Sequence, residues 1–214
     1  MSSFLDLPAE LRNQVYGYIA IPHTAPLSSY IGLYLSCHQI RSEMDGECSK
    51  IFRNYLEIFQ DQLQDARIDI PETFAEMQHV RLHCKPTADF SIIQWFDEVT
   101  DICLLHLASL SIIYGFPGDS SLSHNVDHYL LWLADAMPDQ LKTRVVNSQR
   151  VEMVSFWASE EEAKDFVDEY PHHEFVTANW TFLWDLELDG TLHSVWKKPD
   201  GKGRSEVLAN DTMA

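Results

Sequence analysis

The hydrophobic pattern near the N-terminus predicts one amphipathic helix. Apolar residues recur with the spacing of a helix between Leu11 and Ile19. Pro8 suits the first turn of a helix because its missing N–H needs no partner there. Pro22 and Pro26 end the helix and leave a short connection. The apolar face expected from this spacing comprises Leu11, Val15, Tyr18 and Ile19.

A second helical pattern begins near Ser29 and continues past residue 60. Its apolar residues recur every three or four positions, while charged and amide residues fill the opposite face. Because the pattern is long for one globular helix, we expect a break near Ser36 or Gly46. The apolar positions are Cys37, Ile40, Met44, Cys48, Phe52, Tyr55, Phe59 and Leu63.

After Pro71 the pattern becomes mixed and predicts both strands and helices. Alternation predicts a strand at residues 110–114, and residues 80–84 and 150–157 are expected to form strands as well. Residues 181–188 and 191–196 flank Asp189-Gly190, a pair that favours a tight hairpin turn. Helices are expected at residues 89–103, at residues 122–136, and after Ser159, which forms a capping-box pattern with Glu162.

These elements predict an α+β fold. A helical region, residues 1–65, packs on a small and mainly antiparallel sheet with helices, residues 66–200. Residues 201–214 are rich in Gly and polar residues, and we expect them to form a flexible tail.

The amino-acid composition limits the kinds of molecule that the chain is expected to bind. The 214 residues include 33 acidic and 15 basic ones, which gives a formal net charge of −18. Nucleic acids and anionic membrane surfaces are therefore not expected partners, since both attract Lys and Arg. The hydrophobic share of 45% is typical of a folded chain.

Targeting signals and cysteine usage predict an intracellular protein, cytoplasmic or nuclear. Residues 1–21 have no basic stretch ahead of an apolar one, as a secretory signal has. The longest apolar run, residues 102–116, is too short to span a membrane and contains His106. Four widely spaced cysteines are typical of buried thiols in a reducing compartment: Cys37, Cys48, Cys84 and Cys103.

Histidine pairs do not complete a metal site in the sequence. His124 and His128 lie four apart on an expected helix, and His79 and His83 precede Cys84 on an expected strand. A zinc site needs at least a third ligand, and the sequence identifies none for either pair. Whether either pair binds a metal stays open at this point, and we expect no metal and no cofactor.

One turn has the residues of a hydrolase. The segment Gly118-Asp119-Ser120 follows an expected strand and resembles the nucleophile block of GDSL-type esterases. A nucleophilic serine needs a histidine to accept its proton, and His172 and His193 are the candidates here. Neither lies in the late Asp-x-x-His pattern of that family. A small serine hydrolase using Ser120 is the alternative, while we expect no catalytic residues and no enzyme.

Two short blocks resemble a known family. Residues 4–16, FLDLPAELRNQVY, resemble the opening of fungal F-box-like proteins, of pattern L-P-x-E-L-R-x-x-I/V-Y. Residues 35–43, LSCHQIRSE, resemble the family's next block, of the type L-x-x-C-x-Q-I-R-x-E. The blocks lie 29 residues apart from Pro8 to Cys37, close to the spacing within an F-box. The resemblance covers about residues 4–44.

The resemblance implies a protein-interaction module without enzymatic activity. F-box helices bind the Skp-type linker of a cullin–RING ubiquitin ligase, and the remaining chain binds the protein to be modified. The residues carried over as the linker contact are Leu7, Pro8, Leu11, Val15 and Tyr16. An α+β scaffold with no connection to a ligase is a further alternative.

An acidic surface with aromatic residues is the expected site for the cargo protein. Acidic residues concentrate between the last helix and the hairpin, beside several aromatic residues. Such a surface suits a basic, partly apolar segment of another protein. The alternative is a solvated acidic surface that keeps the protein soluble, with the tryptophans in the core. The aromatic residues are Tyr170, Trp180 and Trp184, and the acidic ones are Asp165, Asp168, Glu169, Asp185, Glu187 and Asp189.

Overall fold

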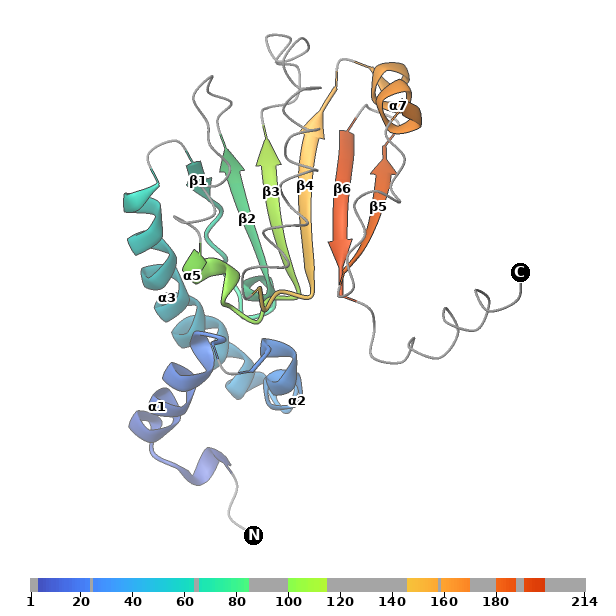
Figure 1. Ribbon diagram of the computed structural model, residues 1–214. Helices are drawn as coiled ribbons and strands as arrows, with labels where there is room; N and C mark the ends of the chain where they lie inside the picture. The colour runs from blue at the N-terminus through green and yellow to red at the C-terminus, as the bar shows by residue number, and fades with distance from the viewer. Residues whose placement is uncertain are drawn as a thin grey trace, which may run out of the picture.

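The computed structural model of the chain places helices at the N-terminus beside and below one sheet (Figure 1). It describes residues 4–23, 25–63, 66–84, 100–114, 146–157, 159–169, 180–187 and 191–198. The N-terminal elements are η1 (Phe4–Asp6), α1 (Ala9–Ala20), η2 (Leu27–Tyr30), α2 (Ile31–Tyr34) and α3 (His38–Gln62).

The predicted break between helices lies at residues 35–37. The Ser36 hydroxyl donates to the Leu33 carbonyl at 2.7 Å, and Cys37 adopts extended backbone, with φ −163° and ψ 163°, as α3 begins. Gly46, the other expected position, lies inside α3. Local hydrogen bonding therefore ends the short helix, and the long one runs uninterrupted for 25 residues.

The sheet has six strands among the described residues, in the order β1-β2-β3-β4-β6-β5. Three neighbouring pairs are antiparallel, while β2–β3 and β3–β4 are parallel, so the sheet is mixed. The predicted α+β class is confirmed. The strands are β1 (Ala66–Ile68), β2 (His79–Cys84), β3 (Ser109–Tyr114), β4 (Arg150–Phe156), β5 (Thr181–Leu186) and β6 (Thr191–Lys197).

Where β2, β3 and β4 begin, the two faces of the sheet differ in polarity because side chains alternate along each strand. On the apolar face, Val80, Leu110 and Val151 stand opposite one another on β2, β3 and β4, and all are buried. On the other face, which we call the polar face, the first residues of the same strands stand opposite one another: His79, Ser109 and Arg150.

One hydrophobic core joins the helical region to the sheet. The apolar positions predicted for the second helix line the buried side of α3, including Met44, Cys48 and Phe52, which are fully buried. They belong to the same cluster as Leu110 of β3 and Trp196 of β6. Cys84 and Cys103 are also buried, and Cys37 is half-buried. In the part of the chain that the structure describes, no helix is both long and apolar enough to cross a membrane.

The remaining predicted elements are partly described. Helix α7 (Glu160–Glu169) begins as expected, with the Glu162 N–H donating to the Ser159 hydroxyl at 3.2 Å. Strands β5 and β6 pair antiparallel, while the turn at Asp189-Gly190 lies outside the described residues. Of the helix expected at 89–103 only α5 (Thr100–Cys103) is described. Residues 122–136 and 201–214 also lie outside the described part. The structure adds η3 (Glu76–Gln78) and the short strand β1.

The outer edge of β1 is covered by one side chain from α3. The Gln60 amide donates to the Ala66 carbonyl at 2.7 Å and accepts from the Ile68 N–H at 2.6 Å. It therefore takes the place of a neighbouring strand. An uncovered edge offers unpaired N–H and C=O groups to other chains.

We expect Gln60→Ala to lower the free energy of unfolding by about 1–3 kcal/mol, because two hydrogen bonds to the backbone are lost. The exposed edge should also increase aggregation, measured by light scattering at rising protein concentration. Asn54→Ala, on the exposed side of the same helix, is the matched control. Equal aggregation of the two variants would show that Gln60 does not protect the edge.

Candidate protein-binding surface on the first helix

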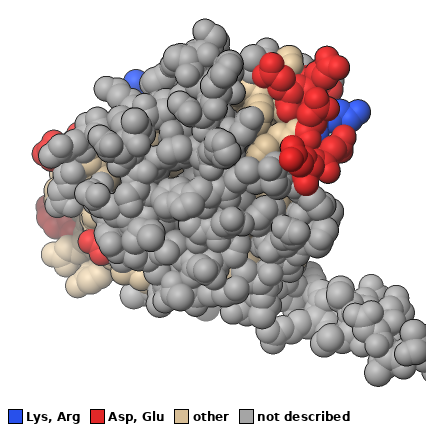
Figure 2. Space-filling model, turned by 45° about the horizontal axis from the view of Figure 1, so that its top comes forward, with Lys and Arg blue, Asp and Glu red and all other residues tan. Residues whose placement is uncertain are grey.

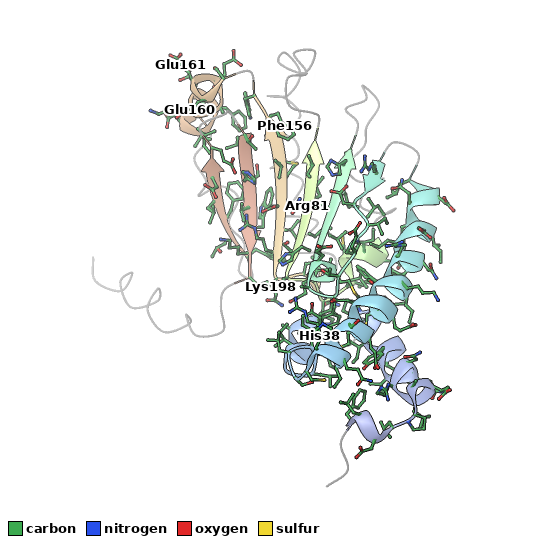
Figure 3. All side chains as sticks on the ribbon, turned by 180° about the vertical axis from the view of Figure 1, so that it is seen from behind. His38, Arg81, Phe156, Glu160, Glu161 and Lys198 are labelled. Atoms are coloured by element: carbon green, nitrogen blue, oxygen red, sulfur yellow. The ribbon has the colours of Figure 1, made fainter. Side chains whose placement is uncertain are left out.

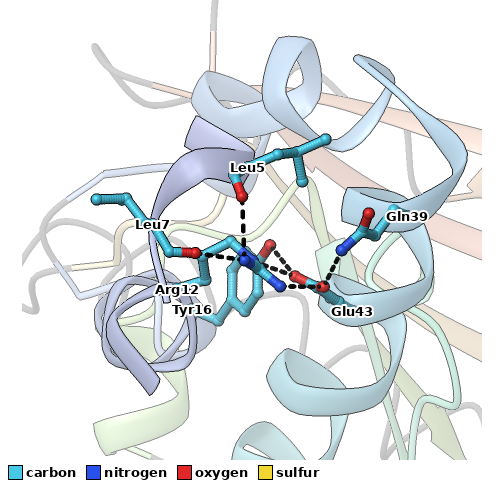
Figure 4. A network of polar contacts seen from close by, with 6 residues as sticks. All are labelled: Leu5, Leu7, Arg12, Tyr16, Gln39 and Glu43. Carbon is cyan, nitrogen blue, oxygen red and sulfur yellow. Dashed lines mark hydrogen bonds and ion pairs between the residues drawn. The ribbon is translucent and has the colours of Figure 1, made fainter. Parts of the chain in front are cut away.

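A charged network ties α1 to α3 (Figure 4). The Arg12 guanidinium donates to both carboxylate oxygens of Glu43, at 2.7 and 2.9 Å. The Tyr16 hydroxyl donates to the same carboxylate at 2.9 Å, and the Gln39 amide does so at 2.9 Å. All four residues belong to the two sequence blocks, so the network joins one block to the other across 31 positions of the chain.

The same arginine also fixes the segment that precedes α1. The third guanidinium nitrogen of Arg12, Nη1, donates to the Leu7 carbonyl at 2.5 Å and reaches the Leu5 carbonyl at 3.5 Å. The ring of Phe4 lies 6.0 Å from that of Tyr16. Segment η1 is therefore held against α1, and Figure 4 shows both leucines beside the arginine.

The network sets the ionisation of its members. Hydrogen bonds from Arg12, opposed by burial and aided by those from Gln39 and Tyr16, lower the pKa of Glu43 from 4.5 to about 2. Burial and the bond to Glu43 raise the pKa of Tyr16. Glu43 is thus a carboxylate and Tyr16 a neutral donor at neutral pH, which is the state that the hydrogen bonds require.

We expect this pairing to make stability depend on pH. The lowered pKa of Glu43 stabilises the fold above pH 4.5, and this contribution is lost as the pH falls from 4.5 towards 2. At neutral pH, Glu43→Gln should therefore be less stable by about 1–2 kcal/mol.

Urea unfolding of both proteins at several pH values measures this dependence. The difference between wild type and Glu43→Gln should shrink as the medium is acidified through that window. A difference that stays constant with pH would contradict the assignment of the charge to Glu43.

The outward side of α1 carries apolar side chains that the fold does not cover. Leu11 and Tyr18 are 45% and 86% exposed. They lie seven residues apart, within about 20° of each other around the helix. Leu5 and Leu7, just before the helix, are 36% and 38% exposed. Among the described residues, these four side chains, which we call the α1 surface, are the majority of the large apolar side chains that are exposed.

The predicted linker contacts divide into three groups. Leu7, Pro8 and Leu11 are exposed and available to a partner. Val15 is half-buried and packs against the core. Tyr16 is fully buried, so the prediction that it contacts a partner is wrong in this fold. Its ring fills the space between α1 and α3, because its hydroxyl has a partner there in Glu43.

The predicted cargo surface is acidic but lacks its main aromatic anchor. Trp180 is 3% exposed, and the Lys198 amine lies 5.2 Å from the centre of its ring. It is therefore a core residue, and its assignment to a binding surface is wrong. Asp185 is exposed on β5, whereas the side chain of Trp184 lies outside what the structure describes. Tyr170 and Asp189 are also outside the described residues.

Half of the acidic residues assigned to that surface lie on α7. Figure 2 shows acidic side chains concentrated at one corner of the molecule. Asp165, Asp168 and Glu169 of the predicted surface are exposed on this helix, as are the neighbouring Glu160, Glu161 and Glu162.

The candidate metal pair on β2 is not brought together. His79 contacts the Ser109 hydroxyl at 2.8 Å, and His83 pairs with Asp69 at 2.8 Å. In the described ranges no group of three or more His, Cys, Asp or Glu side chains could hold a metal ion. The pair His124 and His128 lies outside those ranges.

The residues of the hydrolase alternative are mostly not described. Ser120 and His172 lie outside the described residues. His193 lies on β6 with Nε2 3.1 Å from a Glu187 oxygen.

Sequence reasoning missed the roles of Arg12, Gln39 and Glu43. Each stands at a fixed position of a block, and that spacing was the available signal. Only the fold shows that these polar positions bind one another. Comparisons with protein-family models, with curated proteins and with solved structures find no match for the chain.

Proposed function

We propose that the chain is a non-enzymatic, intracellular protein-interaction module of the F-box-like type. In this proposal the α1 surface binds the Skp-type linker of a cullin–RING ubiquitin ligase, and the rest of the chain binds a protein cargo. The observation that carries the proposal is the exposure of Leu7 and Leu11 within the block that resembles the F-box opening.

The polar and the apolar residues of the two sequence blocks have different roles, which supports linker binding by the α1 surface. Arg12 and Gln39 both donate hydrogen bonds to Glu43, and the Arg12–Glu43 pair holds α1 against α3. The side chains of Leu7 and Leu11 take no part in these polar contacts and are exposed to solvent. Exposed apolar side chains that gather in one segment are typical of protein-binding surfaces.

Direct titration of the purified full chain with a purified Skp-type linker tests the proposal. We expect saturable binding with a dissociation constant in the micromolar range or tighter, which corresponds to about 8 kcal/mol of binding free energy. Calorimetry should show a negative heat-capacity change, since apolar area is buried. Absence of binding would favour a scaffold protein with no ligase connection.

A further inference from the structure

The polar face of the sheet carries basic side chains on four strands. Figure 3 views the molecule from this side, with Arg81 and Phe156 labelled. Strand register places these side chains in adjacent rows, because residues opposite one another point to the same face. The basic members, which we call the strand cations, are Arg67 on β1, His79 and Arg81 on β2, Arg150 on β4 and Lys197 on β6.

The strand cations are accessible to solvent. The side chain of Arg67 is 80% exposed and that of Arg150 is 34% exposed. His79 and Arg81 are exposed, and Lys197 is partly so. A partner approaching this face would therefore reach their charged ends.

Two carboxylates beside the strand cations, those of Asp69 and Glu152, already have partners. Asp69 pairs with His83 at 2.8 Å and lies 3.7 Å from the Arg67 guanidinium. Glu152 accepts from the Ser111 hydroxyl at 2.7 Å and pairs with Arg150. Within the described residues Arg81, which stands between these two sites, forms no ion pair. The described carboxylates thus neutralise only part of the positive charge on this part of the face.

The strand cations form a basic cluster in a chain whose charged residues are mostly acidic. The protein has more than twice as many acidic residues as basic ones, 33 against 15, and many exposed acids lie on α7. Four of the 15 Lys and Arg residues nonetheless share one face of the sheet. Asp185 on β5 lies on the same face at its far edge, so the sign of the charge changes across the sheet.

The width of the cluster indicates the kind of partner. From β1 to β6 the strand cations span four strand spacings, or about 19 Å. One small anion cannot contact side chains so far apart, whereas an extended peptide with several carboxylates can. Charge complementarity of this kind speeds association and selects against basic partners.

We propose that the polar face over β1 to β4 binds an acidic segment of another protein. The guanidinium groups of Arg67 and Arg81 provide the main attraction, since Arg binds carboxylates through two parallel hydrogen bonds. This binding site is separate from the α1 surface and does not depend on linker binding. It replaces the acidic cargo surface that the sequence suggested, and it selects cargo of the opposite charge.

A fluorescent glutamate-rich peptide is the probe, and its anisotropy is measured as the full chain is added. We expect saturable binding that weakens severalfold from low to physiological ionic strength. The double variant Arg67→Ser/Arg81→Ser should weaken binding by about tenfold or more. Lys50→Ser/Arg53→Ser removes the same charge from the exposed side of α3 and should leave the affinity nearly unchanged.

Two results would overturn the proposal. One is absence of saturable peptide binding by the wild-type chain. The other is an equal loss in both double variants, which would show attraction to net charge without a site. A thermal melt of each variant confirms that the fold is retained. Because the substitutions lie on the sheet and α3, failure of the linker to bind α1 would leave this test unaffected.

Discussion

Leu11→Asp is expected to weaken binding of the Skp-type linker by about a hundredfold or more, since a charge buried in an apolar contact costs several kcal/mol. The substitution should leave the fold intact, because Leu11 is 45% exposed and lies on the solvent side of α1. Titration of the purified variant with the linker measures the loss, and circular dichroism confirms the helical content.

Ile58→Asp is the matched control for that experiment. Ile58 lies on α3 and is 59% exposed, so the same chemical change is made at another exposed apolar residue. We expect linker binding by Ile58→Asp to equal that of the wild type. An equal loss in both variants would mean that charge or stability, and not the α1 surface, governs the interaction. Val15→Asp is less suitable, because Val15 packs against the core.

Tyr16→Ala is expected to lower the free energy of unfolding by about 3–5 kcal/mol, as truncation of a buried aromatic side chain does. Tyr16 is fully buried between α1 and α3. Tyr16→Phe keeps the ring and loses only the hydrogen bond to Glu43, so its cost should be about 1–2 kcal/mol. Urea unfolding of the three proteins gives both differences.

One result would contradict the buried position of Tyr16. If Tyr16→Ala keeps the stability of the wild type but loses the linker, Tyr16 is a contact residue and the buried position is wrong. The pair of variants thus separates a packing role from a binding role at one position.

The sequence predicts those helices and strands whose formation depends on residues close together in the chain. The apolar spacing of Met44, Cys48 and Phe52 set the buried side of α3, because a 3.6-residue period leaves one face for the core. The alternation in residues 110–114 predicts β3, whose apolar residues Leu110 and Ile112 are buried in the core. The N-cap of α7 could be predicted because the Ser159 hydroxyl stands three residues before Glu162, whose N–H has no partner within the first turn of the helix.

Long-range pairing could not be predicted in the same way. The buried side of α1 is set by Arg12, Tyr16 and their shared partner Glu43, so Leu11 and Tyr18 face solvent although they are apolar. A helix with apolar residues on both sides offers two possible orientations, and the distant carboxylate selects one.

The sheet shows the same limitation. Strand β1 has only three residues, too few to show an alternating pattern. The pairs β2–β3 and β3–β4 are parallel, so no hairpin turn joins their strands, and the sequence has no turn signal that predicts their pairing. The acidic residues near Trp180 in the sequence favour a binding surface, whereas the fold buries this side chain. Its burial depends on neighbours such as Lys198.

Hydrogen–deuterium exchange of the full chain, with and without saturating linker, tests most directly whether the α1 surface is the binding site. We expect slower exchange in residues 4–20 when the linker is bound, because partner contact suppresses local opening of exposed segments. Exchange in the sheet strands should not change. Slower exchange in the sheet alone, or no change in residues 4–20 at saturation, would contradict the assignment of linker binding to α1.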